Sequence, residues 1–186
     1  MSNVAQDLKR WKIRGFRPRD GAPLEVGLSL KDVVVMLWRF PPIWATLFYR
    51  ASFWCSVHGI RLLPSIFERL NMLCFSIEIS SATAIGPGLY IPHPGGMVLM
   101  ARRIGANCSF IHACTLGMRE TWDFPVLGDA VFVGAGARVL GGIRLGDGCA
   151  VGANAVVIKD VPAGATAVGV PARVREAPRP AVIAVG

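Results

Sequence analysis

Residues 127–157 read LGDAVFVGAGARVLGGIRLGDGCAVGANAVV, and this stretch decides the fold. An aliphatic residue recurs at every sixth position, and a glycine directly follows most of these aliphatic residues. The recurring positions are Leu127, Val133, Val139, Leu145, Val151 and Val157. A period of six is typical of short strands that alternate with corners and stack into a β-helix.

The same register extends back through most of the chain, with two skips. The earlier positions are Ile79, Ile85, Ile91 and Met97 and, one extra residue later, Ile104, Phe110 and Leu116. Three hexads make one triangular coil, so thirteen hexads predict about four coils. A single coil cannot bury its apolar side, but stacked coils bury a continuous core, with parallel strands ~4.8 Å apart. Small residues four positions on, including Cys108, Cys114 and Cys149, are predicted to fill that core rather than bind metal.

The chain before the repeats has a helical pattern. Ser29 is a suitable N-cap for a helix that runs to Phe40, with Asp32 in its first turn. Pro42 begins a second helix that ends near Gly59, and Pro64 begins a third that runs to about Cys74. The aromatic residues of this region are expected to pack the helices together or to cover an oligomer neighbour; they are Trp38, Trp44, Phe48, Trp54 and Phe67.

These patterns divide the chain into four parts. We expect a basic N-terminal tail at 1–28, a helical domain at 29–78, a β-helix domain at 79–174 and a C-terminal tail at 175–186. Hydrophobic residues make up 53% and charged residues 17% of the chain, which is enough apolar material for a core.

The formal net charge is +8, and six basic residues lie between Lys9 and Arg19. This run is either a solvated tail or a contact for an anionic membrane surface; we do not expect nucleic acid as a partner. The five cysteines form no CxxC pair, and no secretory signal or membrane span is visible. We therefore expect a reduced, cytoplasmic protein. The basic run leaves open a contact with the inner face of the membrane.

Three stretches resemble one known family. These are Ile91-Pro92-His93-Pro94-Gly95-Gly96, Lys159-Asp160-Val161-Pro162 and Gly169-Val170-Pro171-Ala172-Arg173. Together with the hexads they are similar to the serine acetyltransferase-like hexapeptide acyltransferases, over about residues 49–174. The resemblance implies a left-handed parallel β-helix and a homotrimer. It also implies that acetyl-CoA, the acyl donor, lies in the groove between neighbouring β-helices, with no metal.

The resemblance also implies the catalytic groups. His93 matches the family's catalytic histidine, and Glu78 matches the acid that orients it. A neutral imidazole can take the proton of an acceptor hydroxyl as that hydroxyl attacks a thioester, while a carboxylate fixes the tautomer. The alternative for His93 is a solvent-facing corner residue.

The repeat register itself places His112 on the same face as His93, one coil away. His112 could hold the acceptor, share the proton transfer or be a surface residue. On the cofactor side, the resemblance extends to Ala135 and Ala153, and with Gly117 it implies small residues that let pantetheine lie against the backbone. Corner packing explains the two alanines almost as well. The cations placed best for the CoA phosphates are Lys159 and Arg173.

Two departures from the family affect the predicted acceptor. Serine acetyltransferases have an aspartate before the catalytic histidine, where this chain has Pro92. Their Arg-His pair is replaced here by the loop Trp122-Asp123-Phe124-Pro125. Because a zwitterion needs charged anchors, we expect a sugar or polysaccharide hydroxyl as acceptor, with Trp122 as a stacking surface. Serine is the alternative acceptor, and a non-catalytic scaffold is a remote one. Zinc chemistry through three histidines is disfavoured, because His58 lies in the helical region.

Overall fold

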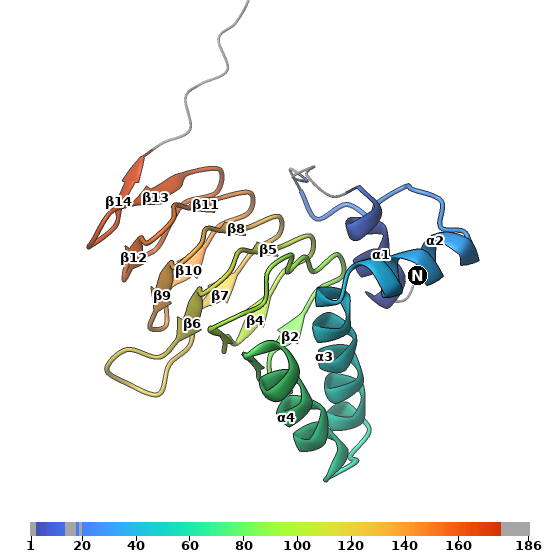
Figure 1. Cartoon of the computed structure of the whole chain (residues 1–186). Helices are drawn as coiled ribbons and strands as arrows, with labels where there is room; N and C mark the ends of the chain where they lie inside the picture. Colours follow the sequence, from blue (N-terminus) through green and yellow to red (C-terminus); the bar gives the residue numbers. More distant parts are fainter. Residues whose placement is uncertain (1–2, 14–17, 19, 176–186) are drawn as a thin grey trace, which may run out of the picture.

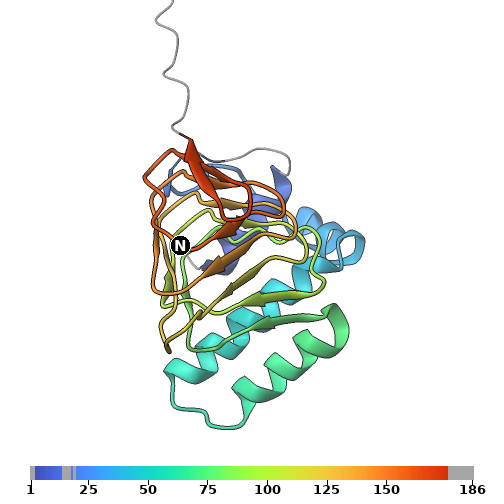
Figure 2. The same cartoon turned by 90° about the vertical axis from the view of Figure 1, so that its left-hand side faces the viewer.

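The computed structural model describes residues 3–13, 18 and 20–175 of the chain. Within them, helices lie at one end of a stack of short strands (Figure 1). Seen along the stack, the coils follow one another around a common core (Figure 2). The predicted parallel β-helix with a helical region in front is confirmed.

The strands form three sheets, one for each side of the coil. The first sheet contains β1 (Ile77–Ile79), β3 (Met97–Leu99), β6 (Thr115–Gly117), β9 (Arg138–Leu140) and β12 (Val156–Val157). The second contains β2 (Ala84–Ile85), β4 (Arg103–Ile104), β7 (Val126–Leu127) and β10 (Arg144–Leu145). The third contains β5 (Ser109–Phe110), β8 (Phe132–Val133), β11 (Ala150–Val151), β13 (Thr166–Val168) and β14 (Arg173–Arg175).

All the strand pairs are parallel except that of β13 with β14. Two of the sheets have five strands, so the stack makes about five turns. The hexad count of about four coils is therefore one short. The closing strand β13 points only the small Ala167 into the core, so it carries no aliphatic residue that marks a hexad.

The thirteen hexad positions form the core. Each of these side chains is at most 4% exposed, and Cys108, Cys114 and Cys149 are fully buried among them. Burial raises the pKa of the Cys108 and Cys114 thiols to about 12. The cysteines are therefore core residues of the repeat, as the register predicts.

The expected helices are present with small shifts in their ends. They are α2 (Leu30–Arg39), α3 (Pro42–Val57) and α4 (Leu63–Phe75). Ser29 caps α2 in a complete capping box, in which Ser29 Oγ accepts from the Asp32 backbone and the Asp32 carboxylate accepts from the Ser29 backbone. Phe48 packs against Phe67 at 6.3 Å between ring centroids, but Trp38 and Trp54 are 89% and 55% exposed.

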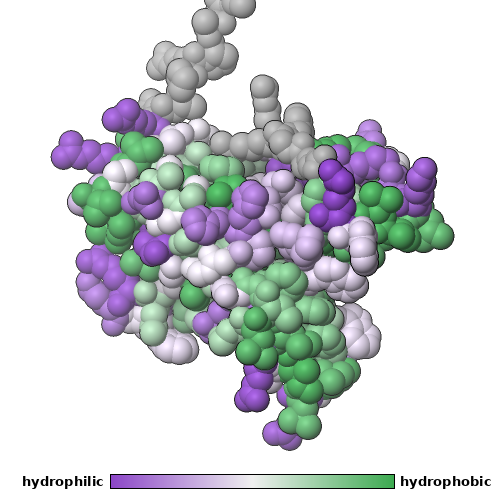
Figure 3. Space-filling view, viewed as in Figure 1, coloured by the Kyte–Doolittle hydropathy of each residue, from purple (hydrophilic) through white to green (hydrophobic). Residues whose placement is uncertain are grey.

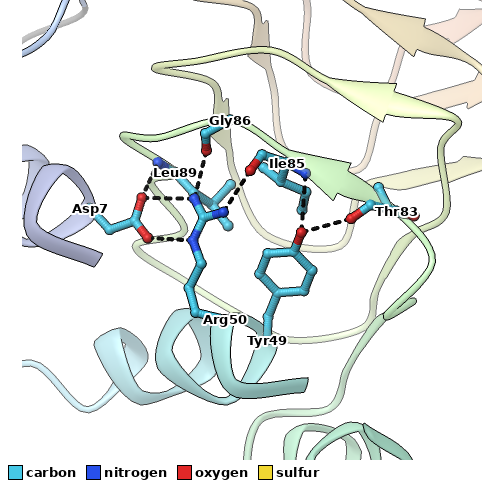
Figure 4. Close-up of polar contacts among 7 residues, drawn as sticks. All are labelled: Asp7, Tyr49, Arg50, Thr83, Ile85, Gly86 and Leu89. Atoms are coloured by element: carbon cyan, nitrogen blue, oxygen red, sulfur yellow. Dashed lines mark hydrogen bonds and ion pairs between the residues drawn. The ribbon is translucent and has the colours of Figure 1, made fainter. Parts of the chain in front are cut away.

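The prediction of a tail over residues 1–28 is wrong, because helix α1 (Asn3–Lys12) packs against the rest of the chain. The Asp7 carboxylate accepts hydrogen bonds from Arg50 Nε at 2.7 Å, Arg50 Nη2 at 3.0 Å and the Leu89 backbone at 2.8 Å (Figure 4). Arg50 also donates to the carbonyl oxygens of Ile85 and Gly86, both at 2.6 Å. Burial raises the pKa of the Asp7 carboxyl, and these hydrogen bonds act against that rise.

This cluster joins α1, α3 and the first coil of the β-helix. The sequence did not reveal this cluster, because the basic run suggested a solvated tail. Two cations of that run instead contact other parts of the folded chain. Arg10 is 2% exposed and lies over the Tyr90 ring, and Lys9 Nζ donates to the Leu24 carbonyl at 2.9 Å. Of the C-terminal tail predicted at 175–186, Arg175 ends β14 and the rest lies outside the described residues.

In the described part of the chain, no helix is both long enough and apolar enough to cross a membrane.

Candidate active site

Four predicted residues lie at one corner of the stack, where the chain passes from the third sheet to the first. We call residues 92–96, 111–114, 134–137 and 152–155 the histidine corner. Backbone hydrogen bonds keep its coils in register, from Ala113 N to Gly95 O at 2.9 Å, Gly136 N to His112 O at 2.9 Å and Asn154 N to Ala135 O at 2.8 Å. His93, His112, Ala135 and Ala153 therefore follow one another in successive coils.

The tight turns of this corner require left-handed backbone. Ala113, Gly136 and Asn154 take φ values of 58°, 69° and 56°. Glycine and asparagine adopt this conformation at little cost. Both histidines of the corner are exposed, Ala135 is half-buried and Ala153 is exposed, so the corner presents imidazoles beside a low surface of small residues.

Glu78 lies on the face that adjoins this corner. It is the middle residue of β1, is paired with Val98 of β3 and is half-buried with its side chain directed outward. It borders a hollow of about 250 Å³ between α4 and the first sheet, which Glu68 and Arg69 also line. In the described part of the chain no hydrogen bond joins Glu78 to His93, so the predicted pair is not hydrogen-bonded in this structure.

The predicted cofactor residues do not lie together. Gly117 ends β6 and accepts a hydrogen bond from Gly141 N at 2.9 Å, and the exposed Lys159 follows β12. Both therefore lie at the edge of the first sheet opposite the histidine corner. The exposed Arg173 begins β14 opposite Val168, at the closing end of the stack.

The sequence interpretation missed a cation at the histidine corner. Arg138 is half-buried, and its Nη1 atom donates to the Gly136 and Ala137 carbonyl oxygens at 3.0 and 3.3 Å and to that of Ala113. The sequence did contain a signal for this cation. Arg138 directly precedes the hexad residue Val139, so its side chain points outward from the strand. Arg138 holds the turn that carries His112 and brings positive charge to the corner.

The loop between β6 and β7 contains the residues expected to stack on a sugar. Trp122 is 81% exposed, and its ring packs edge-on against Phe124 with centroids 5.4 Å apart. Asp123 pairs with Arg102 at 2.5 Å. The aromatic pair thus has a packing role within the loop, which accounts for Trp122 without a ligand.

The chain was compared with known proteins. The model of the bacterial transferase hexapeptide family (six repeats) matches residues 124–159. The serine acetyltransferase of Mycobacterium tuberculosis is 33% identical over 169 residues, which cover 89% of this chain and 71% of the relative. The chain belongs to the serine acetyltransferase family.

Solved structures agree with this assignment. The serine acetyltransferase of Neisseria gonorrhoeae in complex with serine has a TM-score of 0.76 and 31% identity, covering 91% of this chain and 66% of that one. A serine acetyltransferase in complex with CoA has a TM-score of 0.75 and 28% identity, covering 93% and 68%. The chain thus spans about two thirds of the length of these solved proteins. The predicted hexapeptide-repeat acyltransferase class is confirmed.

The predicted sugar or polysaccharide acceptor is wrong, because the relatives and the structural neighbours are consistently serine acetyltransferases. The prediction gave too much weight to Pro92 and to the loop at Trp122. The loss of charged anchors removes contacts, but it does not create a site for another acceptor, and the exposed Trp122 is already packed on Phe124.

Proposed function

We propose that this chain is a serine O-acetyltransferase that uses acetyl-CoA as the donor. The observation that carries the proposal is the family membership, together with His93 at the position where the resemblance puts the catalytic histidine. The structures of relatives bound to serine and to CoA support the two substrates.

In the proposed reaction, His93 acts as the general base. The serine hydroxyl attacks the thioester carbonyl as the imidazole takes its proton, so that one C–O bond forms. The tetrahedral adduct then breaks its C–S bond, and the imidazolium returns the proton to the leaving thiolate. Such a base contributes about 10²–10⁴-fold in rate. Glu78 has the role of orienting the imidazole, which requires the pair to close into contact when substrates bind.

For the donor, we propose that the pantetheine chain lies along Ala135 and Ala153. The fit is supported by the half-buried Ala135 and the exposed Ala153, because a methyl side chain at these positions leaves the backbone of the corner accessible. Lys159 and Arg173 are exposed but lie elsewhere on the stack, so they would meet the phosphates only where a neighbouring β-helix brings them to this groove. The homotrimer expected from the resemblance would place a neighbouring β-helix across this groove.

The test is thiol release from acetyl-CoA with L-serine, comparing wild type with His93→Ala. We expect the variant to lose about 10²–10⁴-fold in kcat. His58→Ala is the matched control, because His58 is also exposed but lies at the end of α3, stacked on Trp54. It should retain wild-type turnover.

His112→Ala decides between the readings left open for that residue. A fall in kcat would indicate a part in proton transfer, a rise in the KM for serine would indicate acceptor binding, and unchanged kinetics would indicate a surface residue. Absence of serine-dependent thiol release in the wild-type protein would refute the proposed function.

A further inference from the structure

Helix α2 presents an apolar face that no other part of the described chain covers. Leu30, Val34 and Trp38 are 80%, 59% and 89% exposed and, at spacings of four, lie along one side of the helix. We call these three residues the α2 stripe. Apolar residues gather over α2 in Figure 3 as well as over α3 and α4. An exposed apolar stripe of this kind marks an interaction surface.

Positively charged residues flank the α2 stripe. Lys31 and Arg39 are exposed, and within the described residues neither makes an ion pair. The one acidic residue of α2, Asp32, pairs with Lys12 Nζ at 2.8 Å and is thereby offset. In the sequence, Arg14, Arg17 and Arg19 follow α1, outside the described residues.

A hollow beside the stripe combines apolar and basic groups. It measures about 400 Å³ and lies between α1 and α2, where its lining includes Trp11, Val35 and Phe40 as well as Lys31 and the ion pair of Lys12 with Asp32. The Lys31 ammonium, which makes no ion pair within the described residues, lies above an apolar floor and suits a phosphate headgroup together with the upper part of its acyl chains.

We propose that the α2 stripe and this hollow dock the protein onto an anionic phospholipid bilayer, with α2 lying in the plane of the interface. Charge favours this partner over a second copy of the chain. A symmetric pairing of two α2 faces would bring Lys31 and Arg39 of both copies together, and like charges repel. The bilayer offers opposite charge to the cations and an apolar phase to the stripe.

The test is flotation of the full chain with vesicles of phosphatidylcholine alone or with about 30 mol% phosphatidylglycerol. We expect binding to the anionic vesicles and its loss at about 0.5 M salt. Leu30→Gln/Trp38→Gln should weaken binding by about tenfold or more, and Lys31→Gln/Arg39→Gln by about fivefold for each charge removed.

Leu73→Gln is the matched control, because Leu73 on α4 is 81% exposed, like Leu30, but lies away from the cations of α2. It should bind as wild type does. The proposal is overturned if the chain ignores anionic vesicles or if Leu73→Gln weakens binding as much as the stripe variant. It is also overturned if the stripe variant changes the molar mass in light scattering, since the stripe would then join copies of the chain. Serine-dependent thiol release by the stripe variant should be unchanged, so the docking is tested independently of the proposed function.

Discussion

The β-helix and the helical front are stabilised in different ways. In the β-helix the same contact is repeated, with thirteen hydrophobic side chains at most 4% exposed, one above another. The front joins the first coil through a few polar contacts that occur once, chiefly the Asp7–Arg50 pair and the Tyr49 hydroxyl. Repeated contacts share the stability among many positions, whereas single contacts concentrate it. Substitutions in the two regions should therefore differ in their effects.

The largest expected effect is in the front. Arg50→Met leaves the Asp7 carboxylate, whose side chain is 3% exposed, buried without its cation. Removing one partner of a buried pair costs about 3–5 kcal/mol, because the remaining charge has lost both water and its partner. The measurement is the free energy of unfolding in urea.

Arg102→Met is the control for Arg50→Met, since it breaks the ion pair with Asp123 where Arg102 is 63% exposed. We expect a loss below about 1 kcal/mol there. The double variant Asp7→Leu/Arg50→Met, which removes both charges of the pair, should be more stable than Arg50→Met alone. Equal losses in the Arg50 and Arg102 variants would contradict the contrast between the two regions.

Next comes a deletion inside the repeated core. Leu116 is fully buried on β6, between β3 and β9, and Leu116→Ala should cost about 3 kcal/mol through lost burial and the cavity left behind. Calorimetry or urea unfolding gives the value. Leu73→Ala on α4, at an 81% exposed position, should stay within about 0.5 kcal/mol of wild type. A cost at Leu73 like that at Leu116 would mean that α4 is covered by another subunit.

This difference also explains how far the sequence could predict the structure. The β-helix repeats one rule, so its period of six predicts the inward residues, including Cys108 and Cys149. The Ser29 cap of α2 and the proline at the first position of α3, Pro42, likewise act locally and are visible in the sequence. The Asp7–Arg50 pair has no period, and its members are 43 residues apart, so α1 was read as a basic tail.

Only the part of the candidate site that follows from the hexad register could be predicted from the sequence. The stacking of His93, His112, Ala135 and Ala153 follows from counting hexads, and the structure places them at one corner. The prediction that Lys159 and Arg173 bind the same cofactor depended on the resemblance. In the structure these two residues lie elsewhere on the stack. The choice of acceptor depends on individual side chains, and a repeating pattern in one sequence does not predict their effect on specificity.

A smaller effect is expected at the second polar contact of the front. The Tyr49 hydroxyl donates to the Thr83 carbonyl at 2.7 Å and accepts from the Ile85 backbone at 3.1 Å, and it is fully buried (Figure 4). Tyr49→Phe leaves both backbone groups unpaired, which should cost about 1–3 kcal/mol in urea unfolding. Tyr90→Phe serves for comparison, since no hydrogen bond of its hydroxyl is found within the described residues. A loss at Tyr90, which is less buried than Tyr49, as large as the loss at Tyr49 would contradict the assignment of this cost to the two hydrogen bonds.

The smallest effect tests the local signals of the front. Ser29→Ala removes the cap of α2 and should cost about 1 kcal/mol, because the Asp32 backbone N–H loses its partner. Ser56→Ala, at an exposed position within α3, should cost less, since alanine is the better helix former there.

Lys12, with further help from Ser29, lowers the pKa of Asp32, so the stability that Asp32 contributes is complete above its ordinary pKa of 3.8 and is lost as the pH falls below it. In Ser29→Ala this acid loss should be smaller than in wild type, because one of the groups that stabilise the carboxylate is gone. An unchanged acid dependence would show that the Ser29 hydroxyl does not stabilise the Asp32 carboxylate, which Lys12 and the Ser29 backbone N–H would then hold.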